Sequence, residues 1–263
     1  MHVWGILIQR PTPGELTRCP SPRSAANRSS SASACPATCS TSCATSRPPG
    51  TTASRWPRLK DPAKVREVLA ETGLRVAGTH ISYFKLDEFP AFVRFCSDFG
   101  AKLLMVSCTG DRAEGAASYR KASKVLNEYG RRARDAGLTL CYHNHSWEFK
   151  EVFDGVSGMR ILLEETDPQH VKCCFDTYWV ADGGEDVVAY LTKHRERIGM
   201  LHLKDRKGGT FTEVGAGELD WPGIFKAIEP LNLPWVVTEK DRTEIPAAES
   251  AKLSRAYLKS IGI

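Results

Sequence analysis

Short apolar segments alternate with longer segments of helical periodicity from residue 59 to the end of the chain. In 117–136 the apolar positions recur every three or four residues, and Gly137 follows, which predicts an amphipathic helix with a glycine C-cap. Strands that alternate with helices are typical of a parallel sheet. The pattern predicts strands at 74–80, 102–108, 138–143, 171–176, 198–203 and 235–239, and helices at 64–71, 88–99, 117–136, 157–165, 185–194, 221–229 and 246–260.

These six strand–helix units fall short of the eight in a TIM-type (β/α)8 barrel, although 263 residues suit that fold. Residues 3–9 form a further apolar segment, and they are our candidate for the first strand. The second strand, and the helix before it, would then fall within residues 10–58. We therefore predict an α/β protein with a TIM-type (β/α)8 barrel that is incomplete or disordered in the region of its first helix and second strand.

Residues 1–58 differ in composition from the rest of the chain. Between Thr17 and Arg58 there is no Leu, Ile, Val, Phe, Met or Tyr, and Ser, Thr, Ala, Pro, Arg and Cys dominate. Such a segment cannot bury enough apolar surface to offset the entropy lost on ordering it. We divide the chain into a low-complexity segment, 1–58, expected to be disordered or poorly packed, and a barrel domain, 59–263.

The composition of this segment admits three interpretations. Its Arg-rich, Ser-rich and acid-poor composition is that of a targeting segment. A zinc knuckle at Cys35, Cys39 and Cys43 is disfavoured, because the spacing departs from paired zinc ligands and no histidine is near. We favour out-of-frame translation, because patterned sequence returns abruptly near Leu59.

The net charge of +5 belongs to the first segment. Residues 1–60 carry eight Lys or Arg and one acid, giving +7, so the remaining 28 basic and 30 acidic residues sum to −2. The barrel domain thus lacks a positive field that would recruit nucleic acid. The apolar run 3–8 is far shorter than the roughly 20 residues of a membrane span, and it lacks the basic leader and small-residue cleavage site of a secretory signal. Nine cysteines, an odd number, argue against a disulfide framework, and we expect a cytoplasmic protein without a membrane partner.

Polar side chains stand at the ends of four successive predicted strands. Side chains alternate along a strand, and active sites of parallel α/β barrels lie at the carboxyl ends of the strands. A lone histidine there is more often a structural residue than a ligand. Four converging carboxylates and imidazoles, however, would repel one another or remain unpaired without a cation. The donors suit one divalent ion, Mn, Co, Zn, Fe or Mg. The four residues are His143, Asp176, His202 and Glu239.

Five strings, in this order and spacing, carry a resemblance to a known family. They are YHNHSWEF (142–149), FDTYWV (175–180), LHLKD (201–205), VGAGELDW (214–221) and TEKD (238–241). From about Leu59 onward the chain resembles the xylose-isomerase-like TIM-barrel superfamily of sugar-phosphate isomerases and epimerases. The resemblance implies a small-molecule carbohydrate substrate and leaves self-association to a homo-oligomer open.

In that superfamily a Glu, an Asp, a His and a second Glu from four successive strand ends bind one metal. Asp176, His202 and Glu239 match three of these positions. His143 stands where the first Glu is expected, so either His143 replaces it, or His145 or Glu148 reaches in from the loop.

The resemblance implies proton transfer next to a carbonyl through an enediolate. We expect Glu239 to be the base and His143 or Glu148 to act from the opposite side. Asp205 is expected to orient a loop or groups behind the ligands, and 214–221 is expected to be a loop that closes over the site. Substrate contacts are expected from His80, His145, Trp179 and Lys204; Trp179 occupies a position at which related ketose epimerases carry histidine.

Three alternatives to an isomerase or epimerase stay open at this point. A lyase or dehydratase acting on a keto-sugar, keto-inositol or 3-keto-glycoside would share the removal of the proton. A DNA-repair nuclease of the same architecture is disfavoured by the negative barrel domain and the small number of ligands. If residues 1–58 truly replace an early helix and strand, the chain could be an inactive metal-binding remnant.

Overall fold

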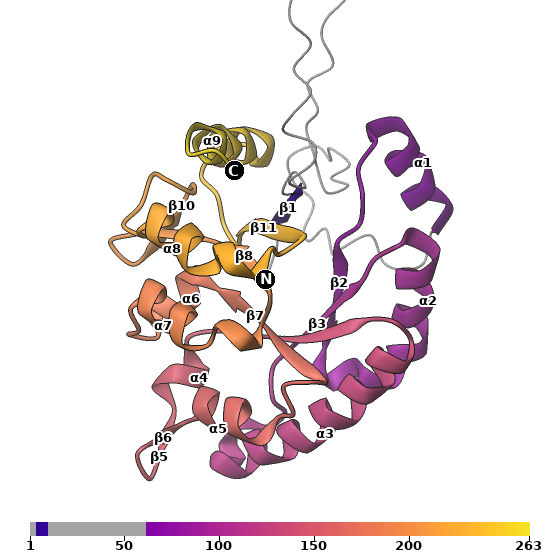
Figure 1. Cartoon of the computed structure of the whole chain (residues 1–263), viewed down its shortest axis with the longest axis vertical. Helices are drawn as coiled ribbons and strands as arrows, with labels where there is room; N and C mark the ends of the chain where they lie inside the picture. The colour runs from indigo at the N-terminus through magenta and orange to yellow at the C-terminus, as the bar shows by residue number, and fades with distance from the viewer. Residues whose placement is uncertain (1–3, 10–61) are drawn as a thin grey trace, which may run out of the picture.

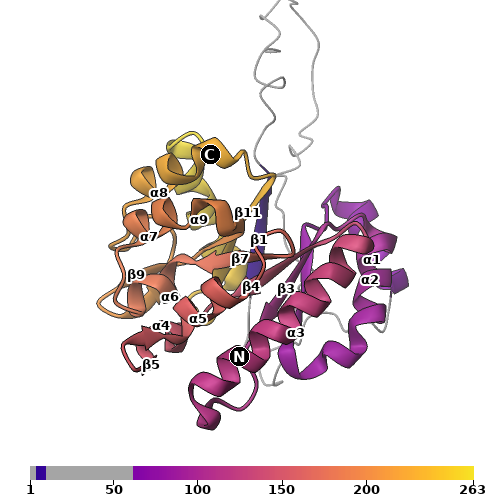
Figure 2. The same ribbon diagram turned by 60° about the horizontal axis from the view of Figure 1, so that its bottom comes forward.

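A seven-stranded sheet forms the centre of the protein, whose computed structural model describes residues 4–9 and 62–263. The interpretations of 10–58 lie outside the described residues. The strands follow the order β1-β11-β8-β7-β4-β3-β2, and the helices cover the outer side of the curled sheet (Figures 1 and 2). The sheet strands are β1 (Trp4–Gln9), β2 (Gly78–Ser82), β3 (Leu103–Ser107), β4 (Thr139–His143), β7 (Val171–Asp176), β8 (Ile198–Leu203) and β11 (Trp235–Lys240).

The predicted helices all occur in the structure, with ends that differ by at most two residues. They are α1 (Pro62–Thr72), α2 (Phe89–Phe99), α3 (Ala116–Asp135), α5 (Gly158–Glu165), α7 (Val187–Lys193), α8 (Trp221–Ile228) and α9 (Ala247–Ser260). Shorter elements were not predicted, because a segment of two to six residues carries no readable period. They are α4 (Trp147–Lys150), α6 (Thr177–Asp182), and the hairpins β5 (Val152–Phe153) with β6 (Val156–Ser157) and β9 (Asp205–Lys207) with β10 (Thr210–Thr212).

Six strands of the sheet are parallel to one another, as expected for a TIM-type fold: β2, β3, β4, β7, β8 and β11. The candidate first strand behaves differently. β1 is a strand, but it pairs antiparallel with β11, with Gly5 opposite Glu239. In a (β/α)8 barrel the first strand runs parallel to the last, so β1 covers the edge of β11 without taking the place of a barrel strand.

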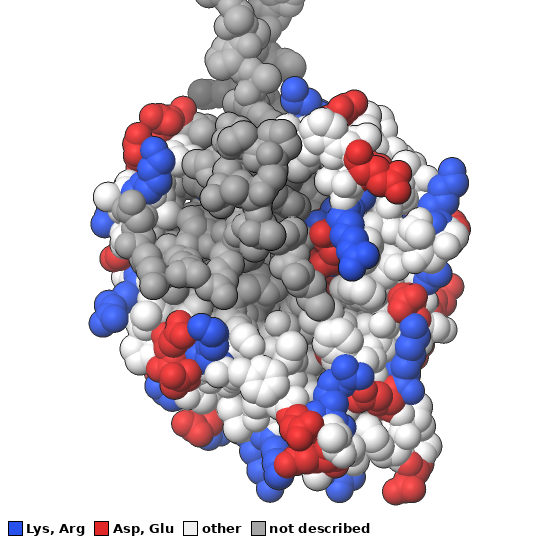
Figure 3. Space-filling view, turned by 180° about the vertical axis from the view of Figure 1, so that it is seen from behind, with Lys and Arg blue, Asp and Glu red and all other residues white. Residues whose placement is uncertain are grey.

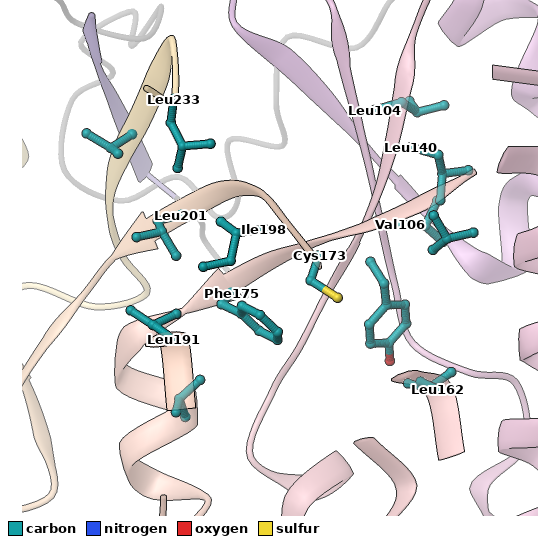
Figure 4. Close-up of a cluster of buried hydrophobic side chains, with 14 of the residues drawn as sticks. Leu104, Val106, Leu140, Leu162, Cys173, Phe175, Leu191, Ile198, Leu201 and Leu233 are labelled. Carbon is teal, nitrogen blue, oxygen red and sulfur yellow. The ribbon is translucent and has the colours of Figure 1, made fainter. Parts of the chain in front are cut away.

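Alternation along the strands divides the buried side chains between two layers. On β7, Cys173 and Phe175 face the helices and join the main core, which Figure 4 shows in part. Cys174, between them, faces the inside of the curl, and the next inward residue is Asp176. The inner layer consists of Leu103, Met105, Cys141, Cys174, Met200 and Val237, with Trp235 packed against it. The floor below the strand ends is therefore apolar and closely filled.

Close packing of helices on the sheet depends on small residues at a few positions. Gly130, within α3, is one of them, since a Cβ there would lie 2.6 Å from the carbonyl oxygen of His170. The strand predicted at 74–80 begins only at Gly78, where a Cβ would lie 2.4 Å from the carbonyl oxygen of Leu103. None of the described helices is long and apolar enough to cross a membrane.

Candidate metal centre

Four strand ends bring their polar residues together at one point. His143 ends β4, Asp176 ends β7, and His202 and Glu239 stand near the ends of β8 and β11. Asp176 lies beside His202 in the parallel register, and Val237, two residues before Glu239, lies on the other side of His202. One ligand atom from each of the four lies within 4.8 Å of the other three, and all four residues are buried. The structure therefore brings the predicted ligands together.

Each of these residues points a buried polar atom at the cluster. His143 Nε2, Asp176 Oδ2, His202 Nδ1 and Glu239 Oε2 make no hydrogen bond of regular geometry, although Lys204 Nζ lies 2.8 Å from Asp176 Oδ2. His143 Nε2 is 3.6 Å from Asp176 Oδ2, and His202 Nδ1 lies against Glu239 Oε2. Buried polar atoms without partners are costly. Two imidazole nitrogens and two carboxylate oxygens around one point are a donor set for a divalent transition metal, so the residues fit such an ion.

The second oxygen of each carboxylate is held by the protein. Asp176 Oδ1 accepts hydrogen bonds from the backbone N–H groups of Tyr178 (3.0 Å) and Trp179 (3.2 Å) and so caps α6. Glu239 Oε1 accepts from Lys204 Nζ at 3.0 Å. Each carboxylate thus has one oxygen fixed and one oxygen directed at the cluster, the usual way of orienting a metal ligand.

A third imidazole, His80 at β2, lies beside the cluster. Its ring centroid is 5.3 Å from that of His143 and 5.1 Å from that of His202, and the latter two are 4.6 Å apart. Burial, followed by the neighbouring imidazoles, holds the pKa values of His80 and His143 well below the ordinary value of 6.5. These rings are therefore neutral at pH 7, the state in which imidazole binds a metal.

Glu148, an expected acid–base group, has both carboxylate oxygens hydrogen-bonded within the protein. It is fully buried, its Oε1 accepts from the Tyr142 hydroxyl at 2.7 Å, and its Oε2 accepts from the backbone N–H of His145 at 2.7 Å. Both oxygens are engaged in holding the loop after β4. This geometry favours a positioning role for Glu148, and among the three candidates for the fourth ligand it is His143 that joins the cluster.

Aromatic rings adjoin the metal cluster. His145 stacks on Trp147 with centroids 3.9 Å apart and lies 5.7 Å from Trp179. Phe211, from the β9–β10 hairpin, is 5.7 Å from Trp179. The expected substrate contacts at His145 and Trp179 therefore lie together, beside His143, whose ring is 5.0 Å from that of His145.

Lys204 is fully buried among carboxylates. Its Nζ lies 2.8 Å from Asp176 Oδ2, 3.0 Å from Glu239 Oε1 and 2.9 Å from Asp241 Oδ2. Burial by itself would lower the pKa of Lys204, but the three carboxylates raise it above the ordinary value, so the ammonium stays charged. Asp241, in the TEKD string, was not among the predicted site residues, since nothing in its spacing shows that Lys204 would reach it.

Comparisons with known proteins identify the family of this chain. Residues 44–261 match the xylose isomerase-like TIM barrel family, and the chain belongs to that family. An inosose dehydratase of Geobacillus thermodenitrificans is 26% identical over 250 residues, covering 78% of this chain and 82% of the relative. A sugar phosphate isomerase/epimerase structure from Parabacteroides distasonis has a TM-score of 0.65 and 25% identity, covering 76% of this chain and 75% of that one.

A second solved structure shares the fold. The IOLI protein, solved with a bound zinc atom, has a TM-score of 0.61 and 16% identity, and the match covers 77% of this chain and 82% of that one. At this identity the likeness concerns the fold alone.

Proposed function

We propose that this protein is a metal-dependent enzyme that removes a proton from the carbon beside a carbonyl of a keto-sugar or keto-polyol, as an isomerase or epimerase. The convergence of four buried ligand atoms at the strand ends carries the proposal. His143, Asp176, His202 and Glu239 would hold one divalent ion. When bound, that ion would polarise the carbonyl and stabilise the negative charge that develops on its oxygen.

Glu239 is the proposed base. Burial alone would raise the pKa of its carboxyl, but contacts with His202 and Lys204 hold the pKa well below the ordinary value. The carboxylate is therefore ionised at neutral pH and able to accept a proton. His143 is the proposed opposite partner, with His80 close enough to share that role, since their rings are 5.3 Å apart. Trp179 offers an indole face to a sugar ring, and His145 lies beside it.

A dehydratase of a keto-inositol is the second candidate. Its support is the similarity to inosose dehydratases, which extends over 78% of the chain in the relative from Geobacillus. Both reactions begin with removal of the same kind of proton. In the isomerase or epimerase the proton returns to carbon, whereas in the dehydratase the hydroxyl on the neighbouring carbon leaves as water.

Deuterium incorporation distinguishes these reactions. Protein stripped of metal and reloaded with Mn would be incubated in D2O with keto-inositols, 3-keto-glucosides and ketoses, and the products followed by NMR. Deuterium in an isomerised or epimerised product supports the first candidate, and an enone-type dehydration product supports the second. Glu239→Gln should lose at least ~100-fold in rate, whereas Glu229→Gln, at an exposed acid, should be unchanged.

Metal analysis tests the ligand set separately. We expect about one divalent ion per chain in the wild type and at least a 10-fold loss of affinity in His143→Ala. A metal content that is unaltered in His143→Ala would exclude His143 as the fourth ligand. Stoichiometric metal without exchange on any ketone would instead favour the inactive remnant.

A further inference from the structure

Arg112, Trp147 and His145 pack together on the loops that follow β3 and β4. Arg112 begins a short 3-10 helix (Arg112–Glu114) after β3, and Trp147 begins α4 after β4. The guanidinium carbon of Arg112 lies over the Trp147 ring, 4.9 Å from its centroid. The His145 imidazole stacks on the same indole, with centroids 3.9 Å apart and an angle of 12° between the ring planes. We call this arrangement the Arg112–Trp147–His145 stack.

The carboxylate of Glu151 orients the guanidinium. Glu151 Oε1 accepts hydrogen bonds from Arg112 Nε, at 2.7 Å, and from Arg112 Nη2, while Oε2 accepts from the Tyr119 hydroxyl at 2.6 Å. Tyr119 is fully buried on α3, and it packs so closely on Gly158 that a Cβ there would lie 2.4 Å from Tyr119 Cζ. The backbone N–H of Glu151 donates to the carbonyl oxygen of Trp147 at 2.8 Å. Glu151 therefore ties Arg112 both to α3 and to the helical turn that carries Trp147.

Stacking positions the imidazole of His145. Trp147 Nε1 and His145 Nδ1 are buried and make no hydrogen bond. His145 Nδ1 lies 3.9 Å from Glu148 Oε1, which is beyond hydrogen-bond distance. The hydrogen bond from His145 to Glu148 comes from the backbone N–H, so it fixes the loop and does not orient the ring. The orientation of the imidazole therefore depends on the indole against which it packs.

The stack extends from the protein surface to the metal cluster. The side chain of Arg112 is 45% exposed, whereas His145 is 7% exposed. The His145 ring lies 5.0 Å from that of His143 and 5.7 Å from that of Trp179. An exposed ion pair contributes little to stability. Loss of the Arg112 side chain should therefore affect the placement of the rings more than it affects the fold.

We propose that Arg112 is a positioning residue of this site, which holds Trp147 against His145 and thereby fixes the imidazole beside the metal cluster. The stack is independent of the proposed function, whereas the contact of His145 with substrate rests on it. Small displacements of groups that hold a substrate reduce rates by up to about 100-fold. An arginine remote from the reacting atoms would thus influence the reaction through the rings that it orders.

Proton NMR of the histidine side chains tests the stack without substrate or metal. The His145 ring protons, identified by their loss in His145→Gln, lie over an indole and should resonate upfield of those of an unstacked histidine. In Arg112→Met they should move downfield, toward their positions in Trp147→Leu. Arg160→Met is the matched control and should leave them in place, because it removes an exposed arginine from an ion pair with Glu164. His145 signals that do not move in Arg112→Met would overturn the proposal.

Thermal unfolding shows whether the change is confined to the stack. The melting temperatures of Arg112→Met and Arg160→Met should lie within about 4 °C of each other, since each variant loses one exposed ion pair. A much larger fall in Arg112→Met alone would mean that Arg112 supports the fold, and this would contradict a role restricted to positioning the rings.

Solvent deuterium exchange on a ketone that the Mn-loaded wild type turns over tests the effect on the reaction. Arg112→Met should lower kcat/KM at least ~10-fold, while the affinity for Mn stays unchanged because all four ligands remain. In a His145→Gln background the same substitution should have no further effect, since Arg112 acts through that ring. An additive loss in the double variant, or an unchanged rate in Arg112→Met, would overturn the proposal. Absence of exchange in the wild type would instead refute the proposed function, and the NMR comparison would still decide on the stack.

Discussion

Replacing Lys204 by Met tests whether the ammonium is the counter-charge of the metal-free site. The side chain is fully buried, and its Nζ contacts carboxylates of Asp176, Glu239 and Asp241 at 2.8–3.0 Å. Met has a similar volume, so packing changes little while three buried carboxylates lose their shared cation. Removing one partner of a buried ion pair costs about 3–5 kcal/mol. For a domain of this size, that corresponds to a fall in melting temperature of roughly 6–20 °C.

The metal should reduce this cost. A divalent ion held by Asp176 and Glu239 supplies positive charge to two of the three carboxylates, so the penalty of Lys204→Met should be smaller with Mn than with EDTA. Thermal unfolding followed by circular dichroism gives the melting temperatures of the wild type and of Lys204→Met, each with Mn and with EDTA. Lys150→Met is the matched control, because Lys150 pairs with Asp182 at the surface and should contribute less than about 1 kcal/mol.

Two outcomes would refute this reasoning. A Lys204→Met variant no less stable than Lys150→Met would mean that the ammonium is not needed as a counter-charge. An equal penalty with Mn and with EDTA would mean that the ion does not share these carboxylates.

Three further predictions concern the fold. Tyr142→Phe should destabilise the protein by about 1–2 kcal/mol in urea unfolding, because the buried Glu148 loses a 2.7 Å hydrogen bond; an unchanged midpoint would contradict it. Gly130→Ala should destabilise by about 1–3 kcal/mol although alanine favours helices, since its Cβ would lie 2.6 Å from the His170 carbonyl oxygen; a gain in stability would contradict that contact. Burial raises the pKa of Cys96 to about 11, so at pH 8 iodoacetamide should label it about 100-fold more slowly than an unfolded control, read by peptide mass spectrometry; equal rates would contradict it.

The periodic elements could be predicted from sequence because their signals are local. β7 and β8 were predicted with the observed ends, since their apolar runs are bounded by polar residues. β2 was predicted to begin four residues too early, because the apolar residues before Gly78 read as strand although they do not pair. The antiparallel direction of β1 could not be predicted, since the pattern of a strand carries no information on its direction.

The candidate ligands were predictable for the same reason. Side-chain alternation places the last inward residue of each parallel strand at one depth, so His143, Asp176, His202 and Glu239 converge once the strands align. The contacts of long side chains, and of side chains on loops, are not determined by the local sequence. The three carboxylate partners of Lys204, and the two hydrogen bonds that remove Glu148 from the cluster, depend on distances between segments that sequence spacing does not encode.

The charged side chains on one face of the protein are relevant to the kind of partner it could bind. In Figure 3, basic and acidic side chains are interspersed on the visible rim, with uncharged residues between them. The visible rim therefore has no single-sign patch of the kind that binds a polyanion. The expectation of a small-molecule substrate is consistent with this arrangement.

The two oxygens of Asp176 make different contacts, and they connect the metal cluster to helix α6. Oδ2 faces the metal cluster, while Oδ1 caps the six-residue helix α6, whose third residue is Trp179. The ring that would meet a sugar is therefore anchored to the same carboxylate that would meet the ion. A substitution at Asp176 would disturb both at once, so its phenotype could not assign either task. The His202 imidazole joins the metal cluster without capping α6, so variants at His202 separate ion binding from the placement of Trp179.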